Sequence, residues 1–188
     1  MLWMRNRLLN KFISYKKQET PLITDDVWQV IRSDKEQLSA NLPDGKLIVP
    51  FTLWLAEYRN PHWNQRIKAG DIAVWFGVED DIQMQEEIVQ QSLANWPVIA
   101  IDFPNYKDGR GFSTAAILRK RFSWDKEVRA IGDVLVDQLI QMARVGFDSF
   151  DLRADQSIEV GLAQFSIYHV SMQNDWRSAR SQLKTVVS

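Results

Sequence analysis

The stretch 98-VIAIDFPNYKDGRGFSTAAILRKRF-122 contains the unit that decides the fold. Its first six residues are almost all apolar, as in a strand that is buried on both faces of a parallel sheet. Residues 113–122 have the apolar spacing of a helix, and Asp108-Gly109 between the two elements is a typical turn dipeptide. A buried strand followed by a helix is the first half of a β-α-β unit, so the stretch predicts an α/β fold.

The same unit recurs along the chain. The predicted strands start at Leu47, Ile72, Val98, Val128 and Ser149, which are 25, 26, 30 and 21 residues apart. Predicted helices follow at 52–59, 81–96, 113–122, 134–145 and 157–165, and Gly146 is suited to end the fourth one. This pattern predicts an open, mostly parallel sheet of about five strands with helices on both faces. The alternative is a partial TIM-like βα array, because five units are too few to close an eight-stranded barrel.

Length and composition fit a single domain, which we place at residues 20–168. The chain has 188 residues, of which 45% are apolar and 25% charged, and its net charge of −1 gives no reason to expect a nucleic-acid partner. No run approaches the roughly 20 apolar residues that span a bilayer. Arg5, Arg7 and Lys11 interrupt the N-terminus, which therefore does not resemble a secretory signal. We expect a cytoplasmic protein.

The two ends of the chain read differently from its centre. Residues 1–18 carry five positive charges and no negative one. Apolar residues recur there every three or four positions, at Met1, Met4, Leu8 and Phe12, which predicts an amphipathic helix with a basic face. We expect it to pack on its own domain or on a second subunit, so a homo-oligomer stays open. Membrane contact is the less favoured alternative, because one short helix binds lipid weakly. Residues 169–188 read as a polar tail.

Residue types that commonly hold cofactors are scarce. The chain has no cysteine, which removes thiol catalysis, disulfides and cysteine-ligated iron–sulfur clusters. His62 and His169 lie far apart without the spacing of a zinc or haem site, so neither is expected to bind a metal or to act as a base. We therefore predict no cofactor, and whether the protein is catalytic stays open.

Polar residues cluster where three predicted strands end. Ligands of open α/β sheets bind at the carboxyl ends of the strands. This places Asp102, Asp108, Arg110, Asp133 and Arg153 on one rim. Ser113 and Asp133 also stand where helix N-caps are expected.

The segment 107-KDGRGFS-113 has two interpretations. As an anion site, Gly109 and Gly111 would let backbone N–H groups approach a ligand, and Arg110 would bind an oxyanion beside a helix N-terminus. As ordinary structure, Asp108 and Gly109 make a turn, and Arg110 pairs with Asp102 or Asp133. The segment lacks the third spaced glycine and the Lys-Ser/Thr pair of nucleotide-binding loops. Taken alone, the motif favours the turn.

Five spaced motifs resemble a known family. They are the Asp-Phe-Pro of 102–104, the Asp-Gly-Arg-Gly of 108–111, the Leu-Arg-x-Arg of 118–121, the Arg-Ala-x-Gly-Asp-Val-Leu-x-Asp-Gln of 129–138 and the Gly-Phe-Asp of 146–148. In this order they resemble DUF934, a bacterial family of unknown function, over roughly residues 20–168. The polar positions that match its pattern are Asp102, Asp108, Gly109, Arg110, Gly111, Arg119, Arg121, Arg129, Asp133, Asp137, Gln138 and Arg153. Of these, we expect Arg119 and Arg129 to be structural.

The resemblance implies a pathway. Members are labelled oxidoreductases or accessory proteins of sulfite reduction, and they are associated with sirohaem-dependent sulfite reductase. The expected function is that of an accessory protein that contacts the reductase or its electron donor through the rim around 102–113. Arg110, Arg121 and Arg153 would there meet acidic or anionic groups. The alternative is an oxyanion-binding enzyme or small-molecule binder, with Arg110 on the anion and Asp102 or Asp133 as acid or base. A weaker alternative is a dimer scaffold in which the rim is only structural.

Overall fold

The computed structural model describes residues 10–17, 19–32, 42–167 and 175–176. These residues form one eight-stranded sheet and six α-helices. The strands are β1 (Lys11–Ser14), β2 (Leu22–Asp25), β3 (Trp28–Val30), β4 (Lys46–Pro50), β5 (Ile72–Phe76), β6 (Val98–Phe103), β7 (Glu127–Gly132) and β8 (Ser149–Phe150). The helices are α2 (Phe51–Glu57), α3 (Pro61–Ala69), α4 (Glu86–Ser92), α5 (Arg110–Lys120), α6 (Leu139–Val145) and α7 (Ile158–Ile167). Short 3-10 turns, η1 (Leu93–Asn95) and η2 (Val136–Gln138), complete the connections.

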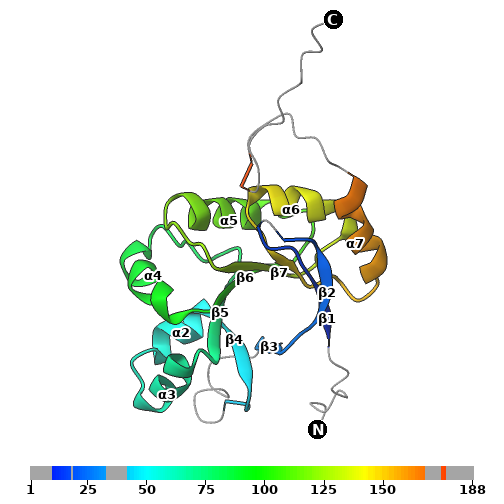
Figure 1. The fold of residues 1–188 in the computed structure, drawn as a ribbon. Helices are drawn as coiled ribbons and strands as arrows, with labels where there is room; N and C mark the ends of the chain where they lie inside the picture. Colours follow the sequence, from blue (N-terminus) through cyan, green and yellow to red (C-terminus); the bar gives the residue numbers. More distant parts are fainter. Residues whose placement is uncertain (1–9, 18, 33–41, 168–174, 177–188) are drawn as a thin grey trace, which may run out of the picture.

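The sheet is wound in one direction only. Its strand order is β2-β1-β8-β7-β6-β5-β4-β3, and β3 to β8 are parallel neighbours in chain order. Right-handed crossovers that never reverse direction leave every helix on the same face. Figure 1 shows the helices on the convex side of the curved sheet. The predicted helices on both faces are therefore wrong, because they require a reversal of strand order. The predicted parallel α/β sheet is confirmed, and the partial βα array is the closer description.

The sheet curls into a half-barrel because its two edge strands are joined by a very short link. β2 and β3 lie at opposite edges, yet only Asp26 and Val27 separate them in the chain. From Asp25 to Trp28 the chain reaches at most about 11 Å. The edges must therefore approach each other where β2 passes into β3.

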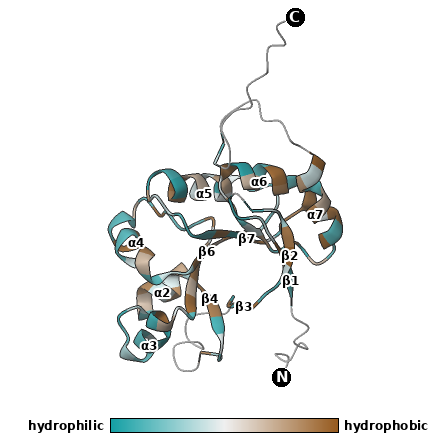
Figure 2. Ribbon diagram, viewed as in Figure 1, coloured by the Kyte–Doolittle hydropathy of each residue, from teal (hydrophilic) through white to brown (hydrophobic). Residues whose placement is uncertain are grey.

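Apolar residues cover both faces of the central strands. On the convex face, residues such as Val74, Ile99 and Ile101 pack with helix residues including Trp54 in the main core. On the concave face a smaller cluster contains Ile48, Ala73, Val98, Ala100 and Ile131. Figure 2 shows helices of mixed character around this sheet. Burial on both faces explains why these strands read as continuous apolar runs.

The N-terminal part of the chain differs from its prediction. Residues 11–14 of the expected amphipathic helix form strand β1, while residues 1–9 lie outside the described residues. Phe12 and Ile13 are both buried, and in a strand they face opposite sides of the sheet. Antiparallel pairing with β2 and β8 provides partners for β1 that a helix period does not reveal.

One helix and part of the C-terminal tail extend what the sequence predicts. Helix α3 was not predicted, although Asn60 caps it and Pro61 stands at its first position. Of the predicted tail, residues 175 and 176 are described, and the Trp176 amide donates a hydrogen bond to the Arg144 carbonyl. Over the described ranges, every helix is too short or too polar to cross a membrane.

Candidate functional site

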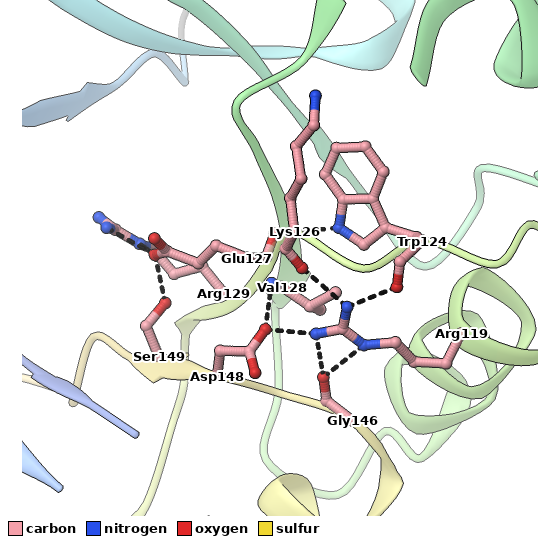
Figure 3. Close-up of polar contacts among 9 residues, drawn as sticks. All are labelled: Arg119, Trp124, Lys126, Glu127, Val128, Arg129, Gly146, Asp148 and Ser149. Atoms are coloured by element: carbon pink, nitrogen blue, oxygen red, sulfur yellow. Dashed lines mark hydrogen bonds and ion pairs between the residues drawn. The ribbon is translucent and has the colours of Figure 1, made fainter. Parts of the chain in front are cut away.

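The amino ends of the strands are held by a buried arginine. Arg119 donates from Nε and Nη2 to the Gly146 carbonyl at 2.9 and 2.7 Å, and from Nη1 to the Trp124 and Lys126 carbonyls at 2.6 and 2.7 Å. It also forms an ion pair with Asp148 (Figure 3). Burial lowers the pKa of Arg119, against the opposing effect of Asp148. With all five N–H groups bonded, Arg119 is a structural residue, as predicted.

Arg121 does not lie on the predicted rim. It follows the last residue of α5 and binds the Glu86 carboxylate through Nε at 3.1 Å and through Nη2. Arg110 is the first residue of this helix, so the two arginines lie about 16 Å apart along its axis. Because α5 runs back along the sheet, Arg121 lies towards the amino ends of the strands. The prediction that Arg121 and Arg110 share one surface is wrong.

The carboxyl-end rim contains a first arginine held between two carboxylates. Arg110 donates to Asp108 from Nε and Nη2, the shorter contact being 2.8 Å, and to Glu79 from Nη1 at 2.9 Å. The Arg110 amide also donates to the Asp108 carboxylate at 3.0 Å. Hydrogen bonds from Arg110 lower the pKa of Asp108. The turn interpretation is therefore correct in kind, but Arg110 pairs with Asp108 and Glu79 rather than with Asp102 or Asp133.

A second arginine on the rim has the same arrangement. Arg153 donates to Asp133 from Nη1 at 2.7 Å, and to Asp155 from Nε and Nη2 at 2.6 and 2.8 Å. Asp133 also accepts a hydrogen bond from the Tyr106 amide at 2.8 Å. The Tyr106 amide and Arg153 together lower the pKa of Asp133. These contacts tie the loop after β6 to the loops after β7 and β8.

The predicted glycine and capping roles need correction. Gly109 has open space around its Cα and an ordinary φ of −79°. A Cβ on Gly111 would meet the Phe103 ring at 2.7 Å, so Gly111 permits close packing on β6 and does not open a ligand approach. Ser113 is exposed inside α5, which already begins at Arg110. Asp133 caps the Tyr106 amide instead of a helix, since η2 begins only at Val136.

The rim carries an excess of negative charge. The loops that follow β5 to β8 contribute the acidic residues Glu79, Asp80, Asp81, Asp108, Asp133 and Asp155 and the basic residues Lys107, Arg110 and Arg153. Both arginines are already matched by two carboxylates each. A further oxyanion would therefore meet a surface that is negative on balance.

Asp102 lies on the concave face, apart from these two groups. Its carboxylate accepts a hydrogen bond from Arg32 at 2.7 Å, and the Arg32 side chain is 49% exposed while that of Asp102 is 10% exposed. The Arg32 guanidinium lies 5.9 Å from the centre of the Trp75 ring. Asp102 and Asp133 thus occupy different surfaces, and the sequence could not place Arg32, which precedes the first predicted strand.

Arg129 is a second buried arginine, and unlike Arg119 it faces the concave side of the sheet. Arg129 binds Asp26 at 2.8 Å, binds Glu127 at 3.0 and 2.8 Å, and lies over the Phe12 ring. Ser149 donates to the same Glu127 carboxylate at 2.6 Å. Burial would lower the pKa of Arg129, but Glu127 and Asp26 outweigh burial and raise it. The structural role expected for Arg129 is confirmed, and Figure 3 shows its contacts on the opposite side of β7 from those of Arg119.

Sequence reasoning missed Asp151. It follows β8 directly and is half-buried. Burial, together with Asp26, raises the pKa of Asp151 to about 6, against the opposing effects of Arg129 and Arg32. The available signal was an acid placed directly after the apolar Phe150 at the carboxyl end of a predicted parallel strand. Where the chain is described, no group of three or more His, Asp or Glu side chains is arranged to hold a metal ion.

Fold and rim together define an α/β half-barrel protein with paired arginines and excess carboxylates at the carboxyl ends of its strands. The chain belongs to the bacterial family DUF934, a family of unknown function, whose model matches residues 73–183. The five motifs all fall inside that range, which starts in β5 and continues beyond α7. A comparison with curated proteins gives no match.

Proposed function

We propose that this chain acts by contact with another protein, as an accessory or partner protein of assimilatory sulfite reduction. The observation that supports contact with another protein is the ion pairing on the rim, where Arg110 and Arg153 are each neutralised by two carboxylates. A rim whose cations are already matched is poorly suited to capture a small oxyanion. The pathway itself rests on the family resemblance.

The charge of the rim indicates what kind of partner surface would fit. Glu79 is 85% exposed on its side chain, and Asp81 and Asp155 are exposed as well. Such carboxylates favour a basic patch on the partner, either the reductase or its electron donor. Complementary charge mainly raises the association rate and suits small, transient interfaces. The sequence predicts the opposite charge on the partner, since the arginines of the rim were expected to contact its acidic or anionic groups.

The alternative of an oxyanion-binding enzyme has less support. Its three residues do not converge, because Asp102 binds Arg32 on the concave face, Asp133 binds Arg153 and Arg110 binds Asp108 and Glu79. Acid–base catalysis needs a group within hydrogen-bond reach of the bound substrate. Neither Asp102 nor Asp133 pairs with Arg110, so neither is placed to exchange a proton with a substrate that binds Arg110.

The test is affinity capture from the native cell with a matched charge reversal. We expect the wild-type chain to enrich a protein of sulfur assimilation, and Glu79→Lys to reduce that enrichment several-fold. Asp125→Lys makes the same charge change in the exposed loop before β7, at the other end of the strands, and should not reduce it. Higher salt should weaken capture, because screening shortens the range of the attraction.

Growth of a deletion strain tests the pathway separately. If the protein acts at sulfite reduction, sulfide should restore growth and sulfite should not. Equal growth of mutant and parent on sulfate, sulfite and sulfide would contradict the pathway. Equal capture by wild type and Glu79→Lys would contradict the rim as the contact surface.

A further inference from the structure

We propose that the concave face of the half-barrel binds a small organic cation, an amine or a guanidine, with the Asp151 carboxylate as its acceptor. This site is separate from the contact surface on the rim. It is carried by the position of Asp151 and by the balance of charged groups around it.

Backbone geometry places the Asp151 side chain on the concave face. The preceding Phe150 points to the convex face, where its ring packs 5.5 Å from that of Phe165. The Asp151 amide donates to the Ala130 carbonyl at 2.9 Å, which continues the pairing of β7 with β8. Side chains alternate along such a strand, so Asp151 lies on the opposite face from Phe150. Ligand-binding residues of βα barrels commonly occupy this position at the carboxyl end of a strand.

The ion pairs of the concave face leave one carboxylate over. Arg129 is bound by Asp26 and Glu127, and Arg32 by Asp102. In the part of the chain that the structure describes, no hydrogen bond reaches the Asp151 carboxylate. Four carboxylates therefore stand against two guanidinium groups. A ligand with one positive charge and N–H donors would reduce this excess from two negative charges to one and would give the Asp151 carboxylate hydrogen-bond donors.

Partial exposure gives a ligand a way in. Arg129 and Asp26 are almost fully buried at 2% and 7% side-chain exposure, whereas the Arg32 side chain is 49% exposed. Asp151 lies between these extremes. A buried carboxylate without donors is costly to ionise, and a cationic donor removes that cost.

The raised pKa of Asp151 predicts the direction in which cation affinity should change with pH. Because that pKa is raised to about 6, the carboxylate is ionised at neutral pH and largely protonated one unit below its pKa. A cation should bind more tightly as the pH rises through this range, and its binding should release a proton. An oxyanion would show the opposite dependence. The charged groups that face Asp151 are Asp26 and Arg32 from the segment around β3, and Arg129 from β7; Phe12 of β1 lies against Arg129.

The experiment is calorimetric titration of the full chain with methylguanidinium and methylammonium chloride at constant ionic strength. We expect saturable binding near neutral pH and about tenfold weaker binding one unit below the pKa of Asp151, because only about a tenth of the carboxylate is then ionised. Asp151→Asn keeps the side-chain shape and should abolish binding. Asp155→Asn removes an exposed carboxylate of the rim and should leave binding unchanged.

Three results would overturn the proposal. They are no saturable heat with either cation near neutral pH, equal binding by Asp151→Asn, and binding of sulfate in place of the cations. Circular dichroism of Asp151→Asn checks that the variant is folded. Partner capture by the same variant should match wild type, so a failure here would not be confused with a failure of the contact surface on the rim.

Discussion

The two ends of the parallel strands use the same residue type in opposite ways. At the amino ends, Arg119 is buried with a side-chain exposure of 1% and bonds to three carbonyls and one carboxylate. At the carboxyl ends, Arg110 is 55% exposed and bonds only to two carboxylates of neighbouring loops. Arg119 and Arg110 both match the family pattern, yet only Arg119 is surrounded by backbone carbonyls.

This difference separates stability from recognition. A buried guanidinium without partners would be strongly unfavourable. The folded state therefore keeps the carbonyls of the loop 121–126 and of the turn after α6 in place around Arg119. An exposed ion pair contributes little to folding because water and salt screen it. In βα barrels the amino-end face commonly serves stability, and the carboxyl-end face serves function.

The largest expected effect comes from removing the amino-end arginine. Arg119→Met keeps an apolar stem but removes the buried ion pair with Asp148 and the hydrogen bonds to three carbonyls, and we expect a loss of about 3–5 kcal/mol in the free energy of unfolding. Arg110→Met is the matched variant at the other end and should change the free energy of unfolding only slightly. Urea denaturation of the three proteins measures both effects.

A second substitution tests the cause of that loss. In the Arg119→Met background, Asp148→Asn removes the buried negative charge that paired with Arg119 and should recover part of the stability. If the double variant is no more stable than the single one, lost packing rather than the buried charge explains the effect. Equal losses for Arg119→Met and Arg110→Met would remove the distinction between the two ends.

The next effect concerns the rigidity of the carboxyl end. Gly132 ends β7 at a φ of +92°, and a Cβ there would lie 2.5 Å from the Phe103 carbonyl oxygen and 2.6 Å from the Asp102 carboxylate. We expect Gly132→Ala to cost about 3 kcal/mol through backbone strain and crowding. Gly109→Ala, at an ordinary φ with open space around it, should be neutral or slightly stabilising. Thermal denaturation compares them, and equal behaviour would mean that the β7 end relaxes freely.

The sequence could predict the parallel part of the fold because local signals agree there. The runs at 47–51, 72–78, 98–103 and 128–132 all overlap observed strands, since burial on both faces leaves a continuous apolar pattern. Strands β1 to β3 have four residues or fewer. Their pairing depends on distant partners, so periodicity could not reveal them. For the same reason the direction of winding was predicted wrongly.

The candidate site was predictable only in position. The carboxyl-end rule placed Asp108, Arg110, Asp133 and Arg153 on the rim, where they lie. Which carboxylate binds which arginine depends on loop geometry, as the pairing of Arg110 with Glu79 over 31 residues shows. The concave face depends on a segment, 26–32, for which the sequence predicted no strand or helix. Asp151 was missed because its environment is made by that segment.

The smallest expected effect sharpens the comparison within the carboxyl end itself, between Asp151 on the concave face and Asp133 on the rim. The pKa of Asp151 is raised to about 6 in the folded protein, whereas an unfolded aspartate titrates near 3.9. The folded state therefore holds the proton more tightly, and the contribution of Asp151 to stability falls as the pH rises from about 4 to about 6. Asp151→Asn removes this dependence and should stabilise the protein by about 2–3 kcal/mol at neutral pH. At about pH 4 variant and wild type should be equally stable.

Asp133 should behave in the opposite sense, because the Tyr106 amide and Arg153 lower its pKa. Its stabilising contribution is present above the unfolded pKa and is lost as the pH falls through the lower folded value. Asp133→Asn should therefore weaken the protein at neutral pH, and the difference should shrink in acid. Urea midpoints measured for both variants across this pH range give two slopes of opposite sign. If the slopes had the same sign, the two carboxylates would share one environment, and the concave face would not be a separate site.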